Sequence, residues 1–232
     1  MKEKNDVLNN RLYIITTYIC NFFVINFWFL VMIAPFLFYL YNFQGSISIP
    51  ILLLISIVIG PALATLFSVN GRLVRDGEVS PTKDFFHFYK LNFFQGLLIG
   101  IILNSFIGML YFDMNYFSLI GDTYLSYLFL FLIVIFIMLG FYIYPIISRY
   151  NVKTVHLIKI STKLLVKKMY ISLSCISMII IVLALIRITG TSLIGLLFGA
   201  SIICYLIMKI ERKAIDELED EIKEQYRDNC DA

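Results

Sequence analysis

Histidine and cysteine are the side chains most typical of catalytic and metal sites, and this sequence has two histidines and four cysteines. His87 and His156 lie in separate polar segments, and neither belongs to a His-x-x-His or Glu-x-x-His pattern typical of metal sites. Three cysteines fall in apolar segments and the fourth near the end of the chain, without a Cys-x-x-Cys pair: Cys20, Cys175, Cys204 and Cys230. They are typical of small apolar core residues. We therefore expect no catalytic residue, metal site or cofactor, and no enzymatic activity.

Basic side chains form two regular stripes instead. Between residues 81 and 94, one face of a predicted helix carries Lys83, His87 and Lys90, opposite aromatic side chains. Between residues 152 and 168, a second predicted helix has apolar residues on one face, Val155, Ile158 and Leu165, and basic residues on the other, Lys153, His156, Lys159, Lys163 and Lys167. Such surfaces fit a partner protein or an anionic lipid headgroup, but ordinary interfacial helices on the cytoplasmic side of a membrane carry them too.

Composition places these stripes in a membrane protein. Apolar residues make up 60% of the chain and charged residues 15%, with a mean hydropathy of +0.86, whereas soluble domains have roughly a quarter charged residues. The 232 residues have room for about six spans of roughly 20 residues each. We expect an all-α polytopic membrane protein with two amphipathic elbow helices and spans at 13–41, 47–69, 91–112, 123–148, 169–186 and 191–208. The first span is too long for a cleaved signal peptide.

The predicted spans contain no Asp, Glu, Lys, Arg or His, which argues against a transporter that moves protons through membrane carboxylates. Their polar residues are typical of hydrogen bonds between helices. A polar substrate path along Asn26 and Asn104 is the alternative. Pro61, after Gly60, and Pro145 are predicted to kink their helices, and such kinks occasionally line transport sites.

The distribution of basic residues predicts the orientation. With six spans, eighteen of the nineteen Lys and Arg residues fall on the side that holds both termini, and only Arg187 falls on the other. The positive-inside rule makes the first side cytoplasmic, and it also explains the basic excess without nucleic acid, for which the sequence has no motif. We divide the chain into a six-span domain, 1–208, and a charged tail, 209–232, predicted to continue the last span as a solvated cytosolic helix.

The segment from Ile59 to Gly100 is the one around which we expect the rest to be organised. It reads as a membrane helix, a cytosolic elbow and a second membrane helix, with Ser80 as the predicted N-cap and Pro81 at the first helical position. This segment resembles the signature of the YesL-like integral membrane proteins of Gram-positive bacteria, a family of unknown biochemical function. The positions that carry the resemblance are Gly60, Pro61, Arg72, Arg75, Gly77, Ser80, Asp84, Phe85 and Asn92.

The resemblance implies a link to carbohydrate uptake and use. We therefore expect a non-enzymatic accessory or regulatory component of the cell membrane, with the bilayer and sugar transporter subunits or a cytosolic protein as partners. In that role the two elbows would be the docking surfaces. The alternative is a small-solute transporter or channel that acts as a homo-oligomer, with the polar span residues along its path.

Overall fold

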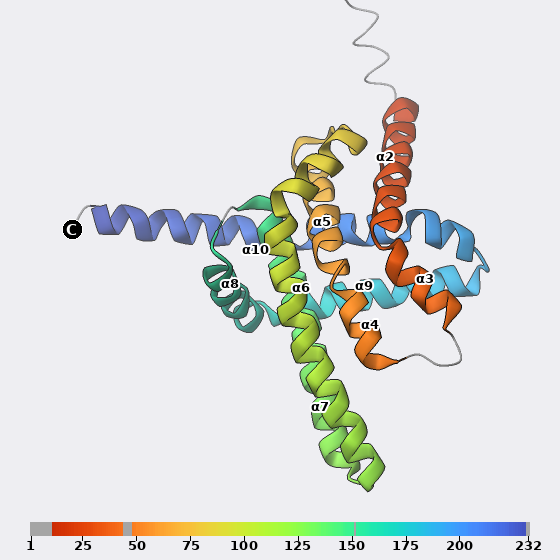
Figure 1. The fold of residues 1–232 in the computed structure, drawn as a ribbon. Coiled ribbons are helices and arrows are strands. Elements are labelled where there is room, and N and C mark those ends of the chain that lie inside the picture. Colours follow the sequence, from red (N-terminus) through yellow and green to blue (C-terminus); the bar gives the residue numbers. More distant parts are fainter. Residues whose placement is uncertain (1–10, 44–47, 151, 231–232) are drawn as a thin grey trace, which may run out of the picture.

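The computed structural model describes residues 11–43, 48–150 and 152–230, and within them it contains helices and no strand (Figure 1). The helices are α2 (Arg11–Met32), α3 (Ala34–Asn42), α4 (Ile49–Ser56), α5 (Ile59–Asp76), α6 (Pro81–Ile120), α7 (Thr123–Arg149), α8 (Thr154–Lys167), α9 (Met169–Ile188) and α10 (Ser192–Cys230). Six stretches are long and apolar enough to cross a membrane. The structure therefore confirms the predicted all-α membrane architecture.

The first two predicted spans are each interrupted. The first divides at Ile33 into α2 and α3, and Pro35 stands in the first turn of α3. The second divides after Ser56 into α4 and α5, and Pro61 stands in the first turn of α5. A proline is tolerated there because the first turn of a helix leaves its N–H groups without intrahelical partners. The interruption thus lies one turn before Pro61, where a proline removes a helix hydrogen bond, and Pro145 lies inside α7.

Helix α6 is 40 residues long and unbroken. The first predicted elbow helix is therefore the beginning of a span, and the helix continues through Asp113, which lies just beyond the predicted end of the third span at residue 112. Ring stacking between α6 and α7 continues beyond the predicted end of the span, with centroids 5.4 Å apart for Phe117 and Phe129. The link to α7 is correspondingly short: Gly121 has a φ of 89°, and the Asp122 carboxylate accepts a hydrogen bond from the Leu125 N–H.

Helix α5 is the centre of the fold. Nearly every residue from Gly60 to Gly71 is buried, and the helix packs against α2, α6, α7 and α10. Figure 1 shows that α9 and α10 run alongside each other and cross the α6–α7 pair, with α5 near the crossing. The segment predicted to organise the chain therefore does lie at its centre.

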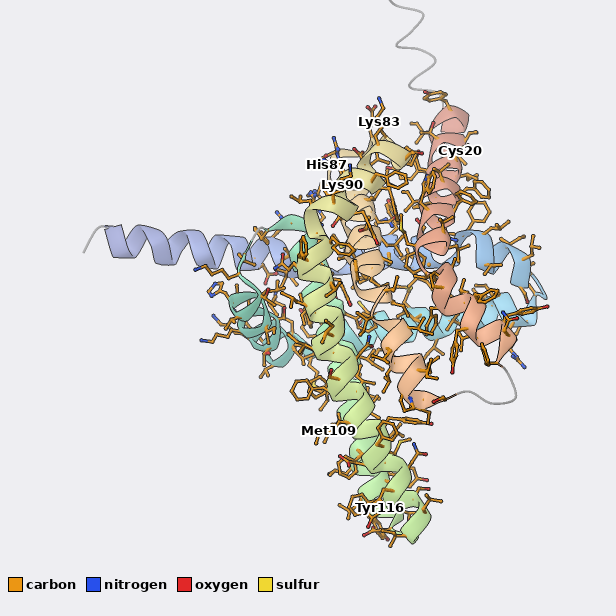
Figure 2. The ribbon with its side chains drawn as sticks, in the orientation of Figure 1. Cys20, Lys83, His87, Lys90, Met109 and Tyr116 are labelled. Carbon is orange, nitrogen blue, oxygen red and sulfur yellow. The ribbon has the colours of Figure 1, made fainter. Side chains whose placement is uncertain are left out.

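The ends of the helices fall into two groups. The start of α2, the α5–α6 connection, α8 and the end of α10 lie at the top and left of Figure 1, and the α6–α7 and α9–α10 connections lie at the bottom and right. Large apolar side chains such as Met109 and Tyr116 are exposed along the α6–α7 hairpin (Figure 2). Exposed apolar surface on this scale is typical of a protein surrounded by lipid.

Two of the expected helix faces need correction. In α8 the buried residues are Leu157, Ser161 and Leu164, whereas Val155, predicted on the apolar face, is 69% exposed. In α10 the helix continues past the sixth span as predicted, but Glu211, Ala214 and Ile215 are buried. The first part of the predicted tail is therefore packed against the other helices instead of being solvated, because its apolar spacing meets α5, α7 and α9.

Candidate functional site: the α5–α6 elbow and the buried polar face of α5

The elbow is held by one carboxylate. Asp84 accepts a hydrogen bond at 2.7 Å from Arg72 Nη1 and one at 2.9 Å from the Ser80 backbone N–H. The side chain of Asp84 is 12% exposed and that of Arg72 is 41% exposed. Arg72 also pairs with Asp76 one turn later, at 3.4 Å. The end of α5 and the start of α6 are thus joined by charge as well as by the short chain between them.

The backbone of the elbow follows the predicted sequence signals with one exception. Gly77 ends α5 with a φ of 76°, a conformation that residues with a Cβ rarely adopt, and Pro81 opens α6. Ser80 occupies the N-cap position as predicted, but its hydroxyl makes no capping bond. The Asp84 carboxylate binds the Ser80 N–H in its place, so the elbow is closed by the same side chain that holds Arg72.

Helices α5 and α6 touch backbone to backbone. A Cβ added to Gly60 would lie 2.5 Å from the Gly96 carbonyl oxygen and 2.9 Å from the Gly100 Cα. Gly96 in turn lies close to Pro61 and Ala64. Sequence reasoning singled out Gly60 but missed its partners, although Gly96 and Gly100 form a Gly-x-x-x-Gly pattern, the spacing of small residues that lets membrane helices approach closely.

Two hydrogen-bonded contacts follow the buried face of α5. Near the elbow, Asn92 of α6 donates to the Ser68 hydroxyl at 2.9 Å. Two residues further along α5, the Ser201 hydroxyl of α10 binds the Asn70 side-chain oxygen at 3.2 Å. All four residues are buried. The polar residues of α5 therefore attach it to two different helices, as expected for polar side chains in membrane proteins.

Asn26 of α2 joins this arrangement from the other side. Its amide nitrogen donates to the Leu196 carbonyl at 2.7 Å, and its amide oxygen accepts from the Ser201 N–H at 3.1 Å. Both ends of the fully buried amide thus bind the backbone of α10. Its polar atoms are occupied by the helix contact, so Asn26 fits the predicted role of interhelical hydrogen bonding better than that of lining a substrate path. Asn104 lies with Ser56 beside a largely apolar cavity of about 290 Å³.

Three arginines gather where the ends of α5 and α7 meet the middle of α10. Arg149 pairs with Asp216 at 2.5 Å, and Arg212 donates to the Val74 carbonyl at 3.3 Å. Arg75 interacts electrostatically with both of these arginines, and its Nη1 atom is buried without a hydrogen-bond partner among the described residues. Arg75 therefore belongs to the packed end of the bundle, whereas Arg72 belongs to the elbow.

Phe85 is fully buried beside Phe86, whose ring lies 4.8 Å from that of Trp28 on α2. Trp28 also donates to the Thr82 hydroxyl at 3.3 Å. The aromatic face predicted for residues 81–94 is thus the face that packs the start of α6 against α2. Its role in this structure is packing.

The two basic stripes are exposed. Lys83, His87 and Lys90 project from the start of α6, as Figure 2 shows. On α8 the exposed basic residues are Lys153, His156, Lys159, Lys163 and Lys167. Gln95 of α6 donates to the Val152 carbonyl at 2.8 Å, which fixes the entry into α8 beside α6. The two histidines lie on separate helices, and within the described ranges no three His, Cys, Asp or Glu residues gather as a metal site would require.

Several buried polar residues escaped the sequence-based reasoning, among them Asn70, Lys168, Ser201 and Glu211. Lys168, between α8 and α9, pairs with Glu217 of α10. The signal available for the α10 residues is the apolar spacing of Ile207, Ala214 and Ile215, which continues beyond the predicted end of the sixth span.

Comparison with known proteins finds a match for the first part of the chain. No curated protein and no solved structure matches the chain. Residues 10–114 match the model of a family described as "Protein of unknown function, DUF624". The matched region contains α2 to α5 and most of α6, including the elbow and the glycine crossing. This region of the chain is therefore similar to a family whose function is uncharacterised.

Proposed function

We propose that this protein is a non-enzymatic accessory or regulatory component of the cell membrane that docks a partner through its two basic surfaces. The observation that carries the proposal is the placement of those surfaces. The basic residues of both stripes are exposed, and the start of α6 and helix α8 lie at the top and left of Figure 1, together with the projecting end of α10. A partner on that side would meet basic side chains from two helices at once.

The hydrogen bonds of the interior support a structural role for its buried polar groups. Asp84, Asn92 and Asn26 each bind another helix or the elbow backbone. Buried groups that are bonded in this way fix the positions of the helices, including the helices that carry the exposed basic residues. A basic surface held in a fixed position is suited to recognition of an acidic partner. The proposed link to carbohydrate uptake rests on the resemblance to YesL-like proteins, and sugar transporter subunits are the partners that it suggests.

Charge reversal on α8 is expected to release the partner without unfolding the protein. The double variant Lys159→Glu and Lys163→Glu replaces two exposed positive charges by negative ones, which repels an acidic surface. Proteins that copurify with the wild type from native membranes in mild detergent should be reduced at least tenfold. The thermal midpoint should stay within about 2 °C, because exposed substitutions change stability by roughly 0.5 kcal/mol.

The matched control is Arg187→Glu, at the α9–α10 connection on the other side of the molecule. It should leave the copurifying proteins unchanged. Equal recovery of partners with the α8 variant and the wild type would refute docking through this surface. A homo-oligomer without any other protein would favour the alternative role in transport.

We also propose that the side carrying these stripes is cytoplasmic, with both termini on it. This assignment follows from the positive-inside rule. A green fluorescent protein fused after Ala232 should then fluoresce, and alkaline phosphatase fused at the same position should be inactive. The reverse pattern would place the basic surfaces outside the cell and overturn the orientation.

A further inference from the structure

Helices α6, α7 and α8 enclose an apolar pocket of about 380 Å³, a volume typical of ligand pockets. The stacked rings of Phe106 and Phe136 form part of its wall, with centroids 5.2 Å apart. Among the described residues that line it, Thr162 is the polar one, and its hydroxyl already donates to the Ile158 carbonyl of its own helix at 2.8 Å. The pocket therefore offers an occupant apolar contacts.

The pocket is open to the surroundings of the protein, because Phe106 and Thr162 line it and are both exposed. Phe106 belongs to the membrane-spanning helix α6, so the surroundings at this position are lipid. An empty apolar pocket loses dispersion contacts, and water inside it would lack polar partners. An acyl chain from the bilayer has the chemistry that fits this space.

The apolar surface of α8 continues outward from the pocket. Its pocket-lining residues are Ile158, Thr162 and Leu165. With 3.6 residues per turn, the next residues around the helix are Val155 and Val166, both of which are largely exposed. The exposure of these two valines is explained if this edge of α8 faces lipid.

Basic side chains follow the valines around α8. Lys159 and Lys163 come next in the helical order, and both are exposed. A helix whose surface changes in this way from apolar to basic is typical of the membrane interface, where basic residues attract anionic headgroups. The pocket and the two lysines thus match the two parts of one molecule, an acyl chain and a negatively charged headgroup.

We propose that the pocket between α6, α7 and α8 binds an anionic phospholipid, with one acyl chain between the three helices and the headgroup beside Lys159 and Lys163. This goes beyond the docking role, which assigns both basic stripes to a partner, whereas the lipid occupies only the edge of α8 next to the pocket. A bound lipid would hold α8 against the α6–α7 pair.

The test is native mass spectrometry of the full-length protein in detergent, titrated with phosphatidylglycerol or with phosphatidylcholine that carries the same acyl chains. Binding of one phosphatidylglycerol should be half complete at a concentration at least fivefold lower than for phosphatidylcholine. A single basic residue near a membrane surface favours an anionic headgroup by about that factor. Equal concentrations for the two lipids would overturn the proposal.

Lys159→Gln tests the headgroup contact. It should raise the concentration of phosphatidylglycerol needed for half-binding about fivefold and leave that of phosphatidylcholine unchanged. The matched control is Lys153→Gln, which removes the same charge from an exposed position of α8 that points away from the pocket-lining face. The control should bind both lipids as the wild type does. Equal effects of the two substitutions would refute the headgroup contact.

Ile135→Trp tests the acyl chain, because it places a larger side chain in the pocket. Half-binding of both lipids should require at least tenfold more lipid. Val134→Trp changes the adjacent residue of α7, which is exposed and lies outside the pocket lining, and it should bind as the wild type does. Unchanged binding by folded Ile135→Trp would contradict the proposal.

The lysine variants decide the question if Ile135→Trp does not fold, since substitutions at exposed positions change stability little. The docking role is measured separately, by the proteins that copurify from native membranes. Its failure would leave the lipid titration of the purified chain unchanged.

Discussion

Replacing Gly60 by alanine is expected to lower the stability of the protein by about 3 kcal/mol, at the upper end of the cost of overpacking. The added Cβ would meet the Gly96 carbonyl oxygen at 2.5 Å and the Gly100 Cα at 2.9 Å. Both are backbone atoms, which cannot rotate away as a flexible side chain would. Helices α5 and α6 must therefore separate, and the buried face of α5 loses contact along its length.

The measurement is the thermal midpoint in detergent, with an expected decrease of roughly 6 to 12 °C for a chain of this size. Gly140→Ala is the matched control, because it is also a buried helical glycine and its added Cβ would have nothing nearer than 3.8 Å. It should be neutral or stabilising by up to about 1 kcal/mol. If Gly60→Ala were as stable as Gly140→Ala, the close crossing of α5 and α6 would be wrong.

Asn26→Leu is expected to destabilise the protein by about 2 kcal/mol, because it removes two hydrogen bonds, worth about 1 kcal/mol each, between a fully buried amide and the backbone of α10. The backbone groups are the Leu196 carbonyl and the Ser201 N–H. Leucine has a similar volume, so the change removes the hydrogen bonds with little loss of packing. The thermal midpoint should fall, and hydrogen exchange at the Ser201 amide should accelerate.

Asn115→Leu provides the comparison for that variant. Asn115 lies in α6, and its amide binds the Tyr111 carbonyl of its own helix at 2.8 Å. Loss of this local contact should change stability by less than about 0.5 kcal/mol. Unchanged exchange at Ser201 in Asn26→Leu would contradict the proposed joint between α2 and α10.

The sequence by itself determined the class of the protein, its six apolar stretches and the limits of the elbow. These features depend on local patterns: long apolar runs, Gly77 at the end of α5 and Pro81 at the start of α6. It also identified the exposed lysines of α6 and α8, because a helix separates its faces with a fixed period. On α8, however, Val155 was placed wrongly on the buried face.

Only the tertiary structure decided which residues meet. Gly60 faces Gly96 and Gly100, Asn26 reaches α10 across 175 residues, and Glu211 lies buried beside Cys175. Such contacts depend on how helices cross, and the period of one helix does not specify its partner on another. A charged residue such as Glu211 resembles a solvated residue in the sequence, and it becomes distinct only when the neighbouring helices enclose it.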